Sequence, residues 1–192
     1  MDGARTKGEM RRRVLAARRE LDEGARDAAG SAVRDALLGV PRLIMGGTVA
    51  VYYSVGAEPN TRKLVAGLHR HGVYVLLPVL LDSGELDWAS YEGPDSLAPA
   101  GRGLLEPTGP RHGVDAVRGA AGVVCPALAV DAAGRRLGRG AGCYDRVLGR
   151  VGPQALTLAV VYDSELVESV PVEAHDRPVR GVVTPGGGVR LF

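Results

Sequence analysis

The chain has 192 residues, of which 45% are hydrophobic and 24% charged, and a formal net charge of +2. This length fits one domain over residues 1–192 with a buried core, and the small net charge gives no sign of nucleic-acid binding. We see no run of 18 apolar residues and no apolar leader, so we expect neither a membrane span nor a secretion signal. The two cysteines form no metal-binding or disulfide pattern and fit a reduced, cytoplasmic setting.

The first part of the chain has helical periodicity. Over residues 5–22 apolar side chains recur at three- and four-residue spacing, which predicts a helix. Its predicted buried stripe consists of Met10, Val14, Ala17 and Leu21. Lys7, Arg11 and Arg18 fall along one border of this stripe, at the edge of the buried face. A second helix is predicted over residues 26–39.

The rest of the chain alternates between strand and helix patterns. Apolar runs predict strands at residues 48–53, 73–77, 86–91, 122–125, 155–161 and 182–184. Helices are predicted at residues 59–70 and 143–150. Residues 93–113 are rich in glycine and proline and are expected to be mostly loop, whereas residues 186–188 predict a hairpin turn. This order favours a single-domain α/β fold, with a Rossmann-like, mainly parallel sheet and helices on both faces.

The most distinctive segment is a glycine-rich stretch that ends where the last predicted helix begins. In Gly138–Gly142, glycines alternate with Arg139 and Ala141, and glycine lets backbone N–H groups approach an anion closely. The N-terminus of the following helix adds unpaired N–H donors. Arg136 and Arg139 bring forked donors that suit phosphate, and Asp145 is a candidate ligand for Mg²⁺. We therefore predict a cradle for a nucleotide triphosphate, although the sequence contains no P-loop motif.

The glycine stretch belongs to a longer pattern. The run from Pro126 to Asp145 reads P-x-x-x-x-D-x-x-G-x-R-L-G-x-G-x-G-x-Y-D, and in this it resembles the 5-formyltetrahydrofolate cyclo-ligase family. Further similarities occur in the order the family has them, over nearly the whole chain. They are K-x-x-x-R at residues 7–11, E-x-x-T at 58–61, L-x-E-P ending at Pro107, and V-P-x-E-x-H-D at 170–176. Such a long pattern with fixed spacing is far more specific than a glycine loop alone.

The resemblance implies an ATP- and Mg²⁺-dependent enzyme that converts 5-formyltetrahydrofolate to 5,10-methenyltetrahydrofolate and releases ADP and phosphate. The γ-phosphoryl group would pass to the formyl oxygen, N10 would attack the activated carbon, and phosphate would leave. Such chemistry requires positioning and charge neutralisation more than acid–base catalysis. The expected partners are these small molecules, without nucleic acid or membrane, and the expected state is a monomer or weak homo-oligomer.

The same resemblance implies roles for individual residues. Arg139 is the implied catalytic residue, between phosphate and folate. Asp145 and Asp176 are the implied ligands of Mg²⁺, and Tyr53 and Glu58 are implied to face the pterin. The residues implied to bind ATP are Lys7, Arg11, Arg136, Leu137, Gly138, Arg139, Gly140, Ala141, Gly142, Cys143 and Tyr144.

Three positions depart from the family pattern. Many members have Lys in place of Ala141, Tyr in place of Cys143 and Asp in place of Arg180. Because a loop cation is missing, a paralogue that binds nucleotide or folate without turnover remains an alternative function. A further alternative, an α/β enzyme acting on a phosphorylated sugar, requires a general base near the loop, and the sequence offers no obvious one.

Purely structural roles are the alternative for several of these residues. The cations of the first helix would then belong to a solvated face, and Asp145 would be a first-turn acid favoured by the helix dipole. Tyr144 has helical spacing to apolar neighbours and fits packing. Cys125 fits an inert buried thiol, and Trp88 fits either the lining of a pterin site or the core.

Overall fold

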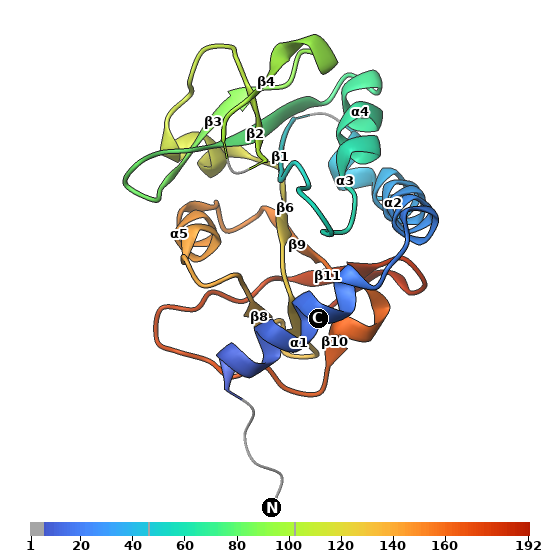
Figure 1. The fold of residues 1–192 in the computed structure, drawn as a ribbon. Coiled ribbons are helices and arrows are strands. Elements are labelled where there is room, and N and C mark those ends of the chain that lie inside the picture. Colours follow the sequence, from blue (N-terminus) through green and yellow to red (C-terminus); the bar gives the residue numbers. More distant parts are fainter. Residues whose placement is uncertain (1–5, 46, 102) are drawn as a thin grey trace, which may run out of the picture.

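A computed structural model of the chain describes residues 6–45, 47–101 and 103–192. Its central sheet has seven strands in the order β12-β11-β9-β6-β1-β2-β3 (Figure 1). The five parallel strands are β1 (Thr48–Val51), β2 (Tyr74–Leu80), β6 (Gly122–Pro126), β9 (Leu156–Val160) and β11 (Gly181–Thr184). The two antiparallel edge strands are β3 (Leu86–Ser90) and β12 (Gly188–Leu191). The predicted mainly parallel sheet and the hairpin before β12 are confirmed.

Helices cover both faces of this sheet (Figure 1). α2 (Glu23–Leu38) and α4 (Arg62–Arg70) pack on one face, and α5 (Cys143–Arg150) packs on the other. Within β1, Val49 belongs to the cluster with α2 and α4, whereas the next residue, Ala50, faces α5. Because both faces are covered, the parallel strands are largely apolar, as is usual in parallel sheets.

Several short elements complete the described part of the chain. They are α3 (Pro41–Ile44), β4 (Leu97–Pro99), β5 (Leu105–Pro107), β7 (Ala129–Asp131), β8 (Arg136–Leu137), β10 (Leu166–Val167), and three 3₁₀ helices at Pro94–Ser96, Val114–Gly119 and Asp163–Glu165. The described part of residues 93–113 is mostly loop, as predicted, but the hairpin of β4 and β5 was not predicted. Gly101 and Gly103 adopt φ values of 75° and 74°, which lets the chain reverse between two strands too short to show a pattern. None of the helices described here has the length and apolar character of a membrane span.

The first helix, α1 (Lys7–Arg19), starts with a capping box. The Thr6 hydroxyl accepts the Glu9 N–H at 3.2 Å, and the Glu9 carboxylate accepts the Thr6 N–H at 2.9 Å. Residue 5, where the helix was predicted to begin, lies outside the described residues. α1 packs through Met10 and Val14 against the β7–β8 hairpin and its neighbours rather than against the large sheet.

The predicted buried stripe of α1 is wrong at Ala17, which is exposed, and Arg18 is buried instead. Arg18 forms a bidentate ion pair with Glu165, with Nε–Oε1 at 2.7 Å and Nη2–Oε2 at 2.8 Å. Its Nη2 also donates to the carbonyl of Ala127 at 2.7 Å, and its guanidinium lies 5.5 Å from the ring centre of Tyr162. This buried pair compensates the charge that burial would otherwise penalise, and it fixes α1 relative to the ends of β6 and β9.

The carboxyl ends of β1, β2 and β6 share one edge of the sheet. Along the chain β2 adds to one side of β1, whereas β6 adds to the other, so the strand order reverses between β1 and β6. Open α/β sheets bind ligands at such a reversal. The glycine-rich loop reaches this edge from β8, a strand of the small sheet β10-β7-β8 that the sequence did not predict.

Candidate active site

A cavity of about 430 Å³ opens at this edge of the sheet, a volume within the range of small-molecule sites. Every residue predicted for the site lines it. These residues are Lys7, Arg11, Tyr53, Glu58, Arg136, Leu137, Gly138, Arg139, Gly140, Ala141, Gly142, Cys143, Tyr144, Asp145 and Asp176. The fold therefore brings together α1, the segment after β1, the glycine loop, the start of α5 and the segment before β11.

One side of the cavity is apolar and was not predicted. It is formed by Pro78, Leu80, Leu86, Leu104 and Leu105, which come from β2, β3 and the β4–β5 hairpin. Single apolar residues carry no signal that separates a cavity wall from a core, so only the L-x-E-P similarity pointed to this region. Trp88, for which both roles were open, is fully buried and absent from the lining, so it belongs to the core.

The three glycines of the loop meet two geometric demands. Gly140 and Gly142 have φ values of 114° and 66°, which favour glycine strongly. Gly138 has no such φ, but a Cβ there would lie 2.9 Å from Nη1 of Arg136. The carbonyl of Gly138 accepts a hydrogen bond from Nε of Arg11 at 2.9 Å, which ties α1 to the loop.

The loop is anchored by the motif residue Asp131, whose side chain is fully buried. Its carboxylate accepts the N–H groups of Ala133, Arg135 and Val170 at 3.0, 3.1 and 2.8 Å. It also accepts Nε of Arg135 at 2.5 Å. These bonds fix the turn between β7 and β8 and hence the direction in which the loop leaves β8.

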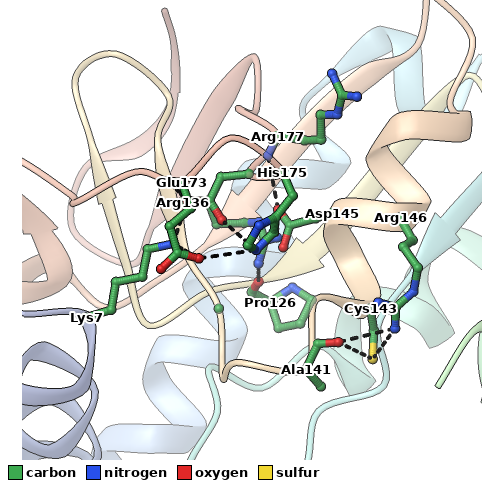
Figure 2. A network of polar contacts seen from close by, with 12 residues as sticks. Lys7, Pro126, Arg136, Ala141, Cys143, Asp145, Arg146, Glu173, His175 and Arg177 are labelled. Atoms are coloured by element: carbon green, nitrogen blue, oxygen red, sulfur yellow. Dashed lines mark hydrogen bonds and ion pairs between the residues drawn. The ribbon is translucent and has the colours of Figure 1, made fainter.

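Three ion pairs join cationic and acidic candidates across the cavity. They are Lys7–Asp176 (Nζ–Oδ2, 2.6 Å), Arg136–Asp145 (Nη2–Oδ1, 2.9 Å; Figure 2) and Arg139–Glu58 (Nη2–Oε1, 3.3 Å). Each predicted metal ligand is therefore paired with a predicted phosphate-binding cation. The carboxylates neutralise these cations in the absence of ligand.

The ion pair with Lys7 lowers the pKa of the Asp176 carboxyl group. Burial alone would raise the pKa of Asp176, but hydrogen bonds from Nζ of Lys7 and from the N–H of Glu173 leave this pKa below its ordinary value. A lowered folded-state pKa means that the contribution to stability is complete above the ordinary value of 3.8 and is lost as the pH falls through the lowered one. Asp176 therefore stays ionised at neutral pH.

The cations differ in burial. The Arg136 side chain is 3% exposed, and its Nε is buried without a hydrogen-bond partner in the described part of the chain. Its partner Asp145 also accepts the N–H of Arg177 at 3.1 Å. Arg139, in contrast, is 59% exposed. Arg136 is therefore preorganised, whereas Arg139 is free to reorient toward a ligand.

Tyr144 combines the two roles that the sequence left open. Its ring packs among apolar residues on both sides of the sheet, but its buried hydroxyl lacks a hydrogen-bond partner among residues 6–45, 47–101 and 103–192. Burial raises the pKa of this phenol well above its usual value, so the hydroxyl keeps its proton and is able to donate a hydrogen bond. Tyr53 is half-buried in the cavity wall, with the guanidinium of Arg62 at 5.2 Å from its ring centre.

Glu173, His175 and Asp176 form a group of candidate metal ligands. One ligand atom from each lies within 4.8 Å of the other two. Asp145 is not a member of this group, although it lines the same cavity. The sequence singled out Glu173 and His175 only as letters of the V-P-x-E-x-H-D similarity.

The three departures from the family pattern fall in different places. Ala141 and Cys143 line the cavity. Arg180 does not: its guanidinium donates to the carbonyl of Pro153, and its N–H donates to the Thr157 hydroxyl at 3.0 Å. Only the first two departures can therefore contact a ligand in this cavity.

The two cysteines should react at very different rates. Cys125 is fully buried, and burial raises the pKa of its thiol to about 11, whereas Cys143 is half-buried in the cavity lining. At about pH 8 we expect one thiol to react rapidly with a disulfide reagent and the second only after unfolding. Nucleotide should slow the rapid reaction, and Cys143→Ser should remove it. Two rapid thiols in the native protein would contradict this assignment.

Taken together, the fold and the cavity define an α/β protein in which a cationic, glycine-lined side of the cavity lies beside an apolar side. The sequence profile of the 5-formyltetrahydrofolate cyclo-ligase family matches residues 4–185. The chain therefore belongs to the 5-formyltetrahydrofolate cyclo-ligase family, as its motifs indicated.

Individual relatives agree with this assignment. The chain is 39% identical over 190 residues to the 5-formyltetrahydrofolate cyclo-ligase of Mycolicibacterium smegmatis, covering 96% of each chain. It is 32% identical over 171 residues to the Escherichia coli K12 enzyme of that name, covering 88% of this chain and 94% of the relative. The structure resembles the solution structure of Aquifex aeolicus 5,10-methenyltetrahydrofolate synthetase with a TM-score of 0.82 and 30% identity, covering 96% of this chain and 92% of that one.

Proposed function

We propose that this enzyme converts 5-formyltetrahydrofolate to 5,10-methenyltetrahydrofolate at the expense of ATP, releasing ADP and phosphate. The observation that carries the proposal is the two-sided cavity, in which a cationic, glycine-lined side meets an apolar side. The first side suits a triphosphate. The second suits a flat pterin ring, because small-molecule sites combine apolar walls with a few polar groups.

On the polar side, the glycine loop and the N-terminus of α5 would bind the phosphates of ATP. Arg136 has a buried Nε without a partner in the described part of the chain, and Arg11 already contacts the loop carbonyl of Gly138. Lys7 adds a third cation at the same end of the cavity. These residues compensate for the lysine that Ala141 replaces, since guanidinium groups and backbone N–H groups together can hold phosphates.

The reaction follows from placing the two substrates side by side. The formyl oxygen attacks the γ-phosphorus and ADP leaves. N10 then attacks the formyl carbon, the C–O bond breaks, phosphate leaves and N10 loses its proton to solvent. Arg139 neutralises the transferring phosphoryl group while Glu58 and Tyr53 contact the pterin side, because Arg139 and Glu58 are already paired across the cavity.

The acidic residues fit a magnesium site. Asp145 and Asp176 line the polar side, and Glu173 lies beside Asp176; carboxylate oxygens are the ligands that Mg²⁺ prefers, together with phosphate oxygens and water. When bound, Mg²⁺ would neutralise phosphate charge. The chain's part is to hold these carboxylates ionised, which Lys7 does for Asp176.

The paired charges predict coupled binding of nucleotide and metal. Lys7 must leave Asp176 to bind phosphate, and this exchange leaves an unpaired carboxylate unless Mg²⁺ takes it. We expect a non-hydrolysable ATP analogue to bind at least about tenfold more tightly with Mg²⁺ than in EDTA. In Asp176→Asn, Lys7 keeps only its longer ion pair with Glu173 (Nζ–Oε2, 3.3 Å) among the described residues, so metal-free analogue should bind several-fold more tightly than to the wild type, with a smaller effect of Mg²⁺. Titration calorimetry measures both, and weaker metal-free binding by Asp176→Asn would contradict the exchange.

The function itself is tested by direct assay. Purified protein is mixed with 5-formyltetrahydrofolate, ATP and Mg²⁺, and the near-ultraviolet absorbance of the methenyl product is followed. Product that appears only with ATP supports the proposal. Bound nucleotide and folate without product would instead favour a paralogue without turnover, the alternative raised by Ala141 and Cys143.

A further inference from the structure

We infer that Arg146 is a positioning residue, which sets the distance between the nucleotide side and the folate side of the cavity. The inference rests on the proposed function, because it requires those two sides to hold the two reactants. Arg146 lies on α5, one residue after Asp145, and its side chain is 39% exposed. It does not line the cavity.

The Arg146 guanidinium joins two separate parts of the cavity wall. Its Nη2 donates to the carbonyl of Gly84 at 2.6 Å and to the carbonyl of Ala141 at 3.2 Å. Figure 2 shows the side chain extending back along α5 to Cys143, the first residue of the helix, and to Ala141 of the loop. Gly84 belongs to the β2–β3 turn, residues 81–85, so one nitrogen connects this turn to the glycine loop.

The two connected parts carry opposite sides of the site. The β2–β3 turn lies between Leu80 and Leu86, which pair with each other and both line the apolar side. Ala141 lies in the loop on the polar side. In the described residues, Arg146 thus fastens the proposed folate wall directly to the proposed phosphate loop.

The fit around Arg146 is close at both ends. A Cβ on Gly84 would lie 3.3 Å from its Nη2, and a Cβ on Gly142 would lie 3.2 Å from its Nη1. Both glycines have positive φ values, 81° and 66°. Glu85 supports the arrangement through an ion pair with Nε at 3.5 Å. The guanidinium therefore lies close against both turns.

Such a residue acts on the rate more than on binding. Phosphoryl transfer requires the formyl oxygen and the γ-phosphorus in line, and a displacement of about 1 Å can cost about a hundredfold in rate. Each substrate, however, contacts one side of the cavity only. Each side keeps its structure when the hydrogen bonds of Arg146 between the two sides are lost. Loss of Arg146 should therefore lower kcat while the affinity for each single substrate is retained.

Arg150 provides a matched control. It lies one turn further along α5 and pairs with the same Glu85 at 2.8 Å, but its other contacts are with Asp115 and the Arg146 carbonyl and not with the glycine loop. We compare Arg146→Met, Arg146→Lys and Arg150→Met. Arg146→Met should lower kcat by about 10- to 100-fold, Arg146→Lys should restore part of the loss, and Arg150→Met should stay within about threefold of the wild type.

Binding is measured separately by calorimetry, with the Mg²⁺ complex of a non-hydrolysable ATP analogue and with 5-formyltetrahydrofolate alone. Both dissociation constants of Arg146→Met should stay within about threefold of the wild type. Equal losses of kcat in Arg146→Met and Arg150→Met, or a loss explained by weaker binding of one substrate, would overturn the positioning role. If Arg146→Met does not fold, the same comparison is made with Arg146→Lys. A wild type without turnover would defeat the proposed function, whereas an active wild type with an unaffected Arg146→Met defeats only this inference.

Discussion

Replacing Arg139 with alanine is expected to lower kcat by about a thousandfold or more, because arginines that stabilise a transferring phosphoryl group contribute that much. Stability should hardly change. Arg139 is 59% exposed and its ion pair with Glu58 is 3.3 Å long, and exposed pairs contribute about 0–1 kcal/mol. The measurements are the rate of methenyl formation at saturating substrates and the melting temperature.

Two further variants sharpen this test. Arg139→Lys keeps the charge without the forked donors and should fall between the wild type and Arg139→Ala. Arg19→Ala removes an exposed arginine of α1 outside the cavity lining and should leave kcat within about twofold of the wild type. A near-normal rate for Arg139→Ala would remove Arg139 from the proposed mechanism. A large fall in melting temperature would point to a structural role instead.

Asp131→Asn should produce the largest loss of stability among single polar substitutions in the motif. The buried carboxylate accepts three backbone N–H groups and Nε of Arg135, and an amide cannot accept all of them. Breaking one partner of such a buried charged network costs about 3–5 kcal/mol, which corresponds to roughly 10 °C in melting temperature for a chain of this size. Denaturant unfolding and calorimetry check the prediction.

An exposed residue of the same type serves as the control. Asp163 also accepts a backbone N–H, that of Gly186 at 3.0 Å, but it lies on the surface. Asp163→Asn should cost less than about 1 kcal/mol. Nucleotide affinity should fall in Asp131→Asn but not in Asp163→Asn, because the turn that Asp131 holds sets the direction of the glycine loop. Similar free energies of unfolding in the two variants would contradict the prediction that the buried network of Asp131 stabilises the fold.

The local parts of this fold were readable in the sequence. The glycine loop and the helix over residues 143–150 were predicted with the bounds that α5 has, because glycine spacing and helical periodicity are short-range signals. The strands of the large sheet other than β12 were predicted within a few residues for the same reason, and β12 was implied only by the predicted hairpin turn before it. The five similarity segments then sufficed to name residues that share one cavity.

The parts that were missed depend on long-range pairing. Arg18 and Glu165 lie 147 positions apart, so the sequence around Arg18 does not indicate that its charge is paired in the fold. The small Ala17 was therefore assigned to the buried stripe instead of Arg18. The ion pairs that occupy Lys7 and Arg136 were missed for the same reason. The strand pair β7–β8 is too short to produce a periodic pattern, and the apolar wall looks like core in the sequence.

The pairing of α1 with the far end of the chain has a consequence for synthesis. Glu165 leaves the ribosome 147 residues after Arg18, an interval of roughly 7 to 30 s at 5–20 residues per second. Throughout that interval the first helix lacks the carboxylate against which its arginine is buried, so its docking is completed only near the end of translation. A nascent chain stalled before Glu165 can therefore place α1 on the β7–β8 hairpin, but it lacks the partners of both Arg18 and Lys7.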